Sequence, residues 1–192
     1  AIEDAKSQQM LASAIEKNTL AGERAVAGAE AYISKMSMQA AVADDQLRPA
    51  LATLVQTTGD VTYSTELLTT ALDVSAATGT DVATVSDALA KAYSGNTKAL
   101  GNLVPGVRDL IKEGADLTTI QGRLNEMMGG AAQEAANTTA GQFQRLKITM
   151  DETKEAIGAA FLPILEKLLP RVQDLAVFLQ NNSDVIVKLV LV

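Results

Sequence analysis

Apolar residues recur at intervals of three and four along most of the chain, the pattern of amphipathic helices. Residues 1–43 contain no proline, and a seam of this spacing runs through them at Leu11, Ile15, Asn18, Gly22, Ala25, Ala29, Tyr32 and Met36. The pattern predicts one long N-terminal helix with a heptad-like seam. A polar Asn18 on that seam would fix the register of an oligomer, and the alternative is a frayed or solvated position.

Residues 44–130 are divided by helix-capping residues into shorter amphipathic segments. Asp44 and Asp45 are candidate caps for a helix that begins near Gln46 and closes at Gly59. The next segment, 61–78, ends at Gly79, after which Thr80 and Asp81 cap a helix through Tyr93; shorter pieces follow, with a cap at Asp116. No alternating run of β-branched residues is long enough to compete as a strand. This region therefore predicts a compact helical subdomain.

Residues 131–182 predict a second long helix. Its seam again alternates intervals of three and four, and the charged residues lie off it; the seam comprises Phe143, Leu146, Met150, Thr153, Ile157, Ala160 and Ile164, and Leu168, Val172, Leu175 and Leu179 carry it onward. Pro163 and Pro170 each remove a backbone donor, so we expect a kink or a break near both. The fold class predicted from the whole pattern is all-α, with long coiled-coil-like helices flanking a compact bundle of short ones.

Residues 183–192 begin a further apolar helix with the run VIVKLVLV. The run is shorter than the ~20 residues that span a bilayer. It fits either the first turns of a membrane helix or the start of a buried one. Because the chain starts at Ala1 without an initiator Met and stops inside this run, we expect it to be an internal segment of a longer polypeptide.

The amino-acid composition excludes most kinds of catalytic site. The 192 residues include no Cys and no His, so thiolate nucleophiles, Ser-His-Asp triads and imidazole metal ligands are excluded. The net charge is −7 with scattered basic residues, and aromatics make up 3% of the chain. Sequence-specific binding of nucleic acid is therefore not expected, since it needs converging cations and, on single strands, stacking rings.

The remaining motifs are weak. GNTKALGNL at 95–103 lacks the glycine and lysine spacing of a phosphate-binding loop and fits a helix-capping turn. The acidic pairs Asp44-Asp45 and Asp151-Glu152 lack the spacing of a calcium loop. We predict no catalytic residue, no metal site, no cofactor and no enzymatic activity.

Two stretches are similar to a known family. The run GDVTYSTELLTTALDVSAATGTDVATVSDALAKAYSGNTKALGNL at 59–103 and the run GGAAQEAANTTAGQFQRLKITMDETKEAIGAAFLPILEKLLP at 129–170 resemble the tape measure proteins of long, flexible-tailed bacteriophages. The chain departs from the family at Thr139-Ala140, where an aromatic often precedes the Gly-Gln pair.

The resemblance implies a structural protein of the virion that occupies the tail tube lumen, sets tail length during assembly and is ejected ahead of the DNA to help delivery across the host envelope. It implies several copies, which we expect to be a homotrimer, and contacts with the tail tube and with tail-tip, distal tail or hub proteins. We expect this segment to lie near the tail tip and to meet the host membrane during ejection. The alternative is a membrane-active module of a pore-forming or secreted effector protein.

Overall fold

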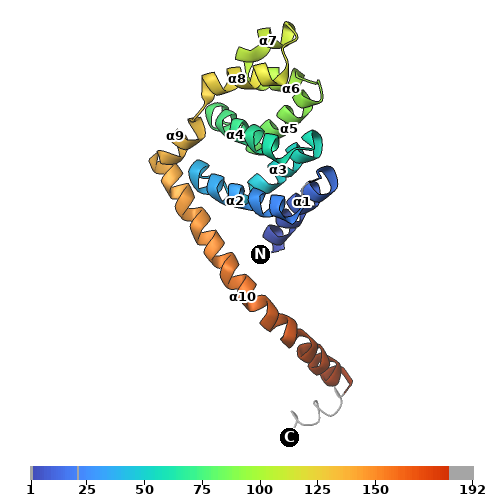
Figure 1. The fold of residues 1–192 in the computed structure, drawn as a ribbon. Helices are drawn as coiled ribbons and strands as arrows, with labels where there is room; N and C mark the ends of the chain where they lie inside the picture. Colours follow the sequence, from blue (N-terminus) through green and yellow to red (C-terminus); the bar gives the residue numbers. More distant parts are fainter. Residues whose placement is uncertain (1, 21, 182–192) are drawn as a thin grey trace. The chain divides into compact units, whose positions relative to one another are not determined.

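The computed structural model describes residues 2–20 and 22–181. They form an all-α fold, and none of these residues lies in a strand, which confirms the predicted fold class (Figure 1). The helices are α1 (Ile2–Asn18), α2 (Glu23–Ala40), α3 (Asp44–Thr58), α4 (Val61–Thr78), α5 (Val82–Tyr93), α6 (Lys98–Leu103), the 3-10 helix η1 (Pro105–Val107), α7 (Arg108–Lys112), α8 (Leu117–Met128), α9 (Ala131–Asn137) and α10 (Thr139–Asn181). The coiled-coil character of the long helices stays a prediction.

The chain forms two compact units. Residues Ile2–Thr149 make up one, which we call the helical body, and the remainder of α10 from Met150 belongs to the other. Within the helical body α3 packs against α1, α4 and α5, while α4 also packs against α8 and α9 (Figure 1). The compact unit is thus larger than the predicted 44–130, because α1, α2 and α9 bury their apolar faces on α3 and α4.

The core is built from Leu, Val, Ile and many Ala side chains. On α3, Leu47, Leu51 and Leu54 are completely buried, and on α4 so are Leu67 and Leu68. Alanines fill the positions where helices approach one another, among them Ala14, Ala29, Ala50 and Ala71. Each buried alanine removes little apolar area from water, so we expect the stability of the body to depend strongly on its few large residues and its polar contacts.

Local capping places the middle helices where the sequence predicts them. Gly59 and Gly79 adopt left-handed conformations, with φ of 68° and 72°, and end α3 and α4. The side chain of Asp81 accepts from the backbone N–H of Thr84, and that of Asp116 from the N–H of Thr119. Short-range hydrogen bonds therefore determine these helix ends, which is why the sequence predicts them well.

We expect these two caps to make stability sensitive to acid. Hydrogen bonds from Thr84 and Thr119 lower the pKa of Asp81 and of Asp116. A carboxylate whose pKa is lowered by folding stabilises the fold above its unfolded pKa of about 3.9, and that contribution is lost as the pH falls through the folded value. In the double variant Asp81→Asn and Asp116→Asn the caps remain but cannot titrate. Urea unfolding at pH 7 and at about pH 2.5 should show a smaller acid loss in the variant than in the parent; equal losses would contradict the assignment.

The predicted N-terminal helix over residues 1–43 is wrong, because α1 ends at Asn18 and α2 begins at Glu23. Asn18 Nδ2 donates to Ala14 O at 2.8 Å, and Thr19 Oγ1 donates to Ile15 O at 2.7 Å. These side chains compete for backbone carbonyls at the end of α1, as Asn and Thr commonly do near helix ends. The interruption lets α1 turn back onto the body instead of continuing as a rod.

The second long helix also differs from the prediction. Residues 131–181 form two helices separated at Thr138. Pro163 and Pro170 both lie inside α10, which continues through them, so a break at either proline is wrong and a kink stays a prediction. The predicted apolar helix at 183–192 falls outside the described residues. Among the helices that are described, none is long and apolar enough to cross a membrane.

Candidate functional site

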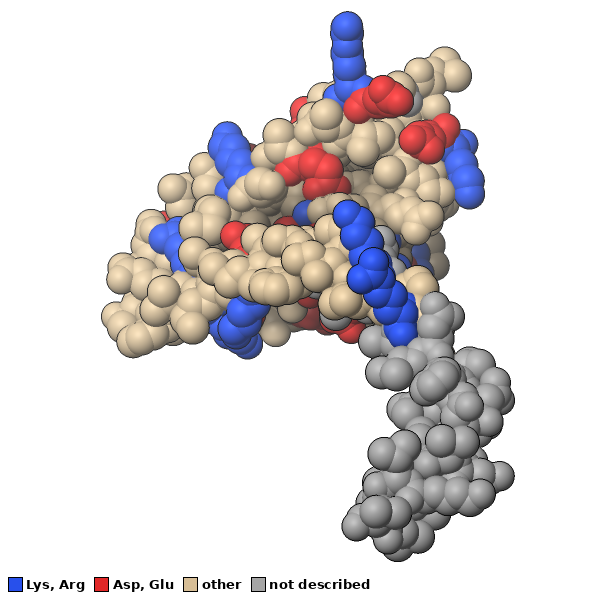
Figure 2. Space-filling view, turned by 90° about the horizontal axis from the view of Figure 1, so that it is seen from below, with Lys and Arg blue, Asp and Glu red and all other residues tan. Residues whose placement is uncertain are grey.

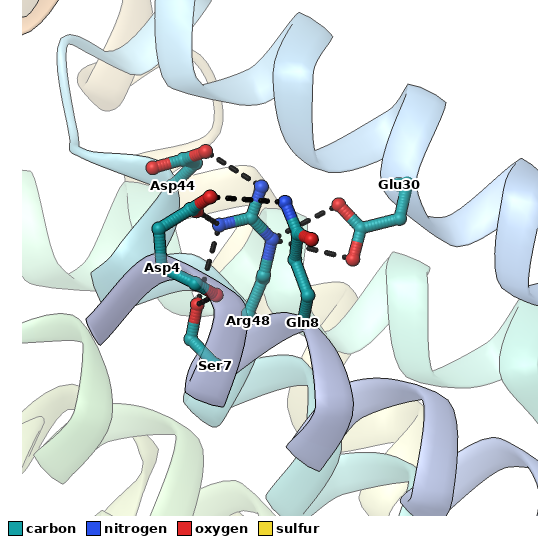
Figure 3. A network of polar contacts seen from close by, with 6 residues as sticks. All are labelled: Asp4, Ser7, Gln8, Glu30, Asp44 and Arg48. Carbon is teal, nitrogen blue, oxygen red and sulfur yellow. Dashed lines mark hydrogen bonds and ion pairs between the residues drawn. The ribbon is translucent and has the colours of Figure 1, made fainter. Parts of the chain in front are cut away.

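A buried arginine joins three helices of the body (Figure 3). Arg48 lies on α3 with its side chain 5% exposed and forms ion pairs with Asp4 of α1, Glu30 of α2 and Asp44 of α3. Its Nε donates to the two carboxylate oxygens of Glu30 at 3.2 and 2.9 Å, and its Nη2 lies 2.6 Å from Asp44 Oδ2. We call Arg48 and its three carboxylates the Arg48 cluster.

Polar neighbours complete the cluster. Ser7 Oγ accepts from Arg48 Nη1 at 3.2 Å, and Gln8 Nε2 donates to Asp4 Oδ2 at 3.1 Å. Asp4 and Asp44 both occupy the first turn of their helices, where the helix dipole favours a negative charge. The sequence therefore brings carboxylates to two helix N-termini, and the fold directs both at one guanidinium.

The Arg48 cluster has a structural role and offers no acid-base chemistry. Burial by itself lowers the pKa of Arg48, but the hydrogen bond that Arg48 donates to Glu30 and the charges of Asp44, Glu30 and Asp4 outweigh it, so the pKa is raised. A guanidinium that stays protonated cannot serve as a general base. The three carboxylates are already paired with it. The arrangement cross-links α1, α2 and α3.

The surroundings of Tyr32, the most enclosed of the described tyrosines, disfavour nucleophilic chemistry at its hydroxyl. Tyr32 lies on α2 beside two open grooves of about 480 and 350 Å³ that run along α2 and α4. Its hydroxyl donates to Thr65 O at 2.8 Å and lies 2.8 Å from Thr69 Oγ1. Burial raises the pKa of this hydroxyl, which disfavours the phenolate a nucleophile would need. No three His, Cys, Asp or Glu side chains among the described residues are grouped as a metal site.

The predicted oligomer seam divides between the two units. Leu11 and Ile15 are fully buried in the core of the helical body, and Met36 packs against that core. Asn18 caps its own helix by donating to Ala14 O. The N-terminal half of the predicted seam is therefore occupied within the chain, because these apolar residues find partners on neighbouring helices of the same molecule.

The other half of the seam, on α10, is exposed. Seven large apolar side chains on this helix are 46–69% exposed: Phe143, Leu146, Met150, Ile157, Phe161, Ile164 and Leu168. At 100° per residue they fall within an arc of about 60° on one face of the helix. We call these seven residues the apolar stripe. Five of them belong to the predicted seam and Leu168 belongs to its predicted continuation, whereas Phe161 was not predicted.

The spacing of the apolar stripe explains why the sequence prediction missed Phe161. Phe143, Leu146 and Met150 are separated by three and four residues, and Phe161, Ile164 and Leu168 repeat these intervals 18 residues later. Eighteen residues make five turns of a straight α-helix, whereas a heptad assumes 3.5 residues per turn. The heptad spacing therefore places Thr153 and Ala160, which are small or polar, on the predicted seam. The 18-residue repeat instead places Phe161 on the same face as Phe143.

The apolar stripe is large enough to bind a partner. Its residues together expose on the order of 600 Å² of apolar surface, which approaches the ~800 Å² per partner of a stable interface. Exposed apolar surface of this extent on a protein is typical of an interaction site. One pair of charged side chains on the same helix is held locally, because Lys154 Nζ lies 2.8 Å from Asp151 Oδ1.

On the face shown in Figure 2, Lys and Arg side chains are scattered among Asp, Glu and uncharged residues. Phosphate binding needs several cations on one surface.

Comparison with protein-family models, with curated protein sequences and with solved structures finds no match for this chain.

Proposed function

We propose that this chain is a structural, non-enzymatic segment of a phage tail tape measure protein that associates with other copies of itself through α10. The observation that carries the proposal is the apolar stripe, which places seven large exposed side chains on one face of a 43-residue helix. A monomer leaves this face in water at a cost of about 25 cal/mol per Å². Other copies of the same helix would cover it.

The residues that resemble tape measure proteins support the same role. The resembling stretch 129–170 contains the whole apolar stripe, and 59–103 contains α4, α5 and α6 of the body. The Arg48 cluster joins α1, α2 and α3 within the body. A helix as long as the 43-residue α10 suits a protein whose task is to occupy length.

The remaining parts of the proposal concern the assembly. The chain acts as a homotrimer in the lumen of the tail tube near its tip, beside tube, distal tail or hub proteins. On ejection it precedes the DNA and helps its passage through the host envelope. Its acidic charge of −7 favours this, because a polyanion repels the DNA that must follow the same path.

A stop codon tests whether the role is structural. In the phage or prophage that encodes this chain, replacing the Gln142 codon by an amber codon should yield heads without tails, because tail assembly would lack the protein that sets tail length. A suppressor strain that inserts Gln should restore tails. Complete tails of normal length on particles that fail to deliver DNA would overturn the proposal and favour the membrane-active alternative.

A further inference from the structure

Helices α9 and α10 meet at a sharp corner inside the helical body. Asn137 ends α9, Thr138 is extended with φ −69° and ψ 163°, and α10 begins at Thr139. The hydroxyl of Thr138 donates to Ala135 O at 2.7 Å and accepts from the N–H of Gly141 at 3.1 Å. Thr138 therefore satisfies backbone groups on both sides of the corner.

The corner requires glycine at position 141. A Cβ atom there would lie 2.5 Å from Ala135 O, Ala136 Cα and Ala136 O, which are backbone atoms of α9. Contacts this short do not occur for real side chains, and backbone cannot rotate away as a side chain can. Any other residue at position 141 would separate α10 from α9.

An arginine fastens the first turns of α10 to α2. Arg145 Nε donates to Met38 O at 2.7 Å, and its Nη2 donates to Gln39 O at 3.2 Å. Both carbonyls lie in the last turn of α2, where no intrahelical donor is left for them and where the helix dipole favours a cation. Nearby, Ile148 of α10 is 5% exposed.

The other end of α9 is held by Asp73 of α4. Its two carboxylate oxygens accept from the N–H groups of Gly130 and Ala132 at 3.1 and 3.0 Å. The start of α9 is thus fixed to the body by α4, while its end is held by Thr138, by the close approach of Gly141 and by longer bonds from Gln142 and Arg145 to Asn137.

The same sequence also suits a straight helix. Residues 131–149 contain no proline, and the pattern of the sequence predicts one helix through them. A continuous helix would restore the i to i−4 hydrogen bonds that Thr138 interrupts, but it would lose the bonds of Arg145 to α2. Thr138, Thr139 and Gly141 are weak helix formers, which favours the corner. The two arrangements exchange one set of hydrogen bonds for another.

From these contacts we propose that the α9–α10 corner is a two-state element, in which Gly141 and Arg145 hold the bent form and their release joins α9 and α10 into one helix from Ala131 to Asn181. The corner and its opening do not rest on the proposed function.

Two spin labels test the proposal. The chain has no Cys, so cysteines placed at the exposed positions Ser34 on α2 and Lys147 on α10 would carry the only labels. The parent should give one short, narrow distance distribution. In Gly141→Ala, which blocks the corner and favours helix, we expect a longer distance to dominate, with the bent population reduced about tenfold or more. Far-UV circular dichroism should show equal or higher helicity.

Matched variants separate opening from unfolding. Gly122→Ala in α8 makes the same chemical change where nothing lies within 4 Å of the new Cβ, and it should leave the distance unchanged. Arg145→Met removes the bonds to α2 and the longer bonds to Asn137 Oδ1, leaves the close approach at Gly141 unchanged, and should give a mixture of both distances. A parent-like distribution in Gly141→Ala and in Arg145→Met, with helicity retained, would overturn the proposal.

Discussion

Replacing Ile157 and Ile164 by Asp should leave the chain monomeric at concentrations where the parent associates. Both residues lie in the apolar stripe and are 56% and 51% exposed. Covering a large apolar side chain stabilises a complex by about 1.5–3 kcal/mol, and a carboxylate in its place would have to lose its hydration. We expect the association constant, measured by sedimentation equilibrium, to fall by roughly 100-fold or more.

A control with the same charge change sits on the opposite face of α10. Ala159 and Gln173 are exposed, and both lie more than about 150° around the helix from the centre of the stripe. Asp at these two positions adds the same negative charges without covering or uncovering the stripe. This pair should associate like the parent. A parent that stays monomeric at high concentration, or a stripe variant that associates as tightly, would refute self-association through α10.

Replacing Arg48 by Met should destabilise the helical body by about 3–5 kcal/mol, as expected when one partner of a buried ion pair is removed. Methionine preserves much of the side-chain volume, so the loss reports the charge and its hydrogen bonds. Asp4, Glu30 and Asp44 would then face one another without a cation, with side chains 23–28% exposed. Urea unfolding measures the effect, in the background of the two stripe Asp substitutions so that association does not contribute.

The matched control is Lys91→Met on α5. Lys91 and Asp87 form an ion pair with side chains 52% and 51% exposed, and such pairs contribute well under 1 kcal/mol. We expect the Lys91 variant to unfold at nearly the parental urea concentration. If the Arg48 variant lost no more stability than this control, the cluster would not be what ties α1, α2 and α3 together.

The features that could be predicted well from the sequence are those determined by residues close to one another in the chain. Gly79 ends α4 and Asp81 begins α5, because a left-handed glycine and a carboxylate acting on the next turn need no distant partner. The exposed part of the α10 seam was also predictable, since a helix alone determines which residues share its face. Phe161 was missed because a heptad spacing was assumed in place of the 3.6 residues per turn of an α-helix.

The features that were missed depend on contacts between distant segments. Leu11 and Ile15 carry a periodicity that suits an oligomer, and only the packing of α1 on α3 shows that they are used within the chain. Arg48 pairs with Asp4, which lies 44 positions earlier in the chain. The sequence alone indicates only Asp44 as a partner, at the i, i+4 spacing of a helical ion pair. The corner at Thr138 depends on the backbone of α9 lying against Gly141, which no local pattern reveals.

The most direct measurement of the tape measure role is tail length after lengthening α10. Duplicating residues 143–178 inserts 36 residues, which is ten helical turns, so the apolar stripe keeps its face; at 1.5 Å per residue the rod grows by roughly 54 Å. Electron microscopy of negatively stained particles should then show tails longer by about this amount, while the parental phage gives the original length. Normally assembled tails of unchanged length would contradict the proposal that this helix helps to set tail length.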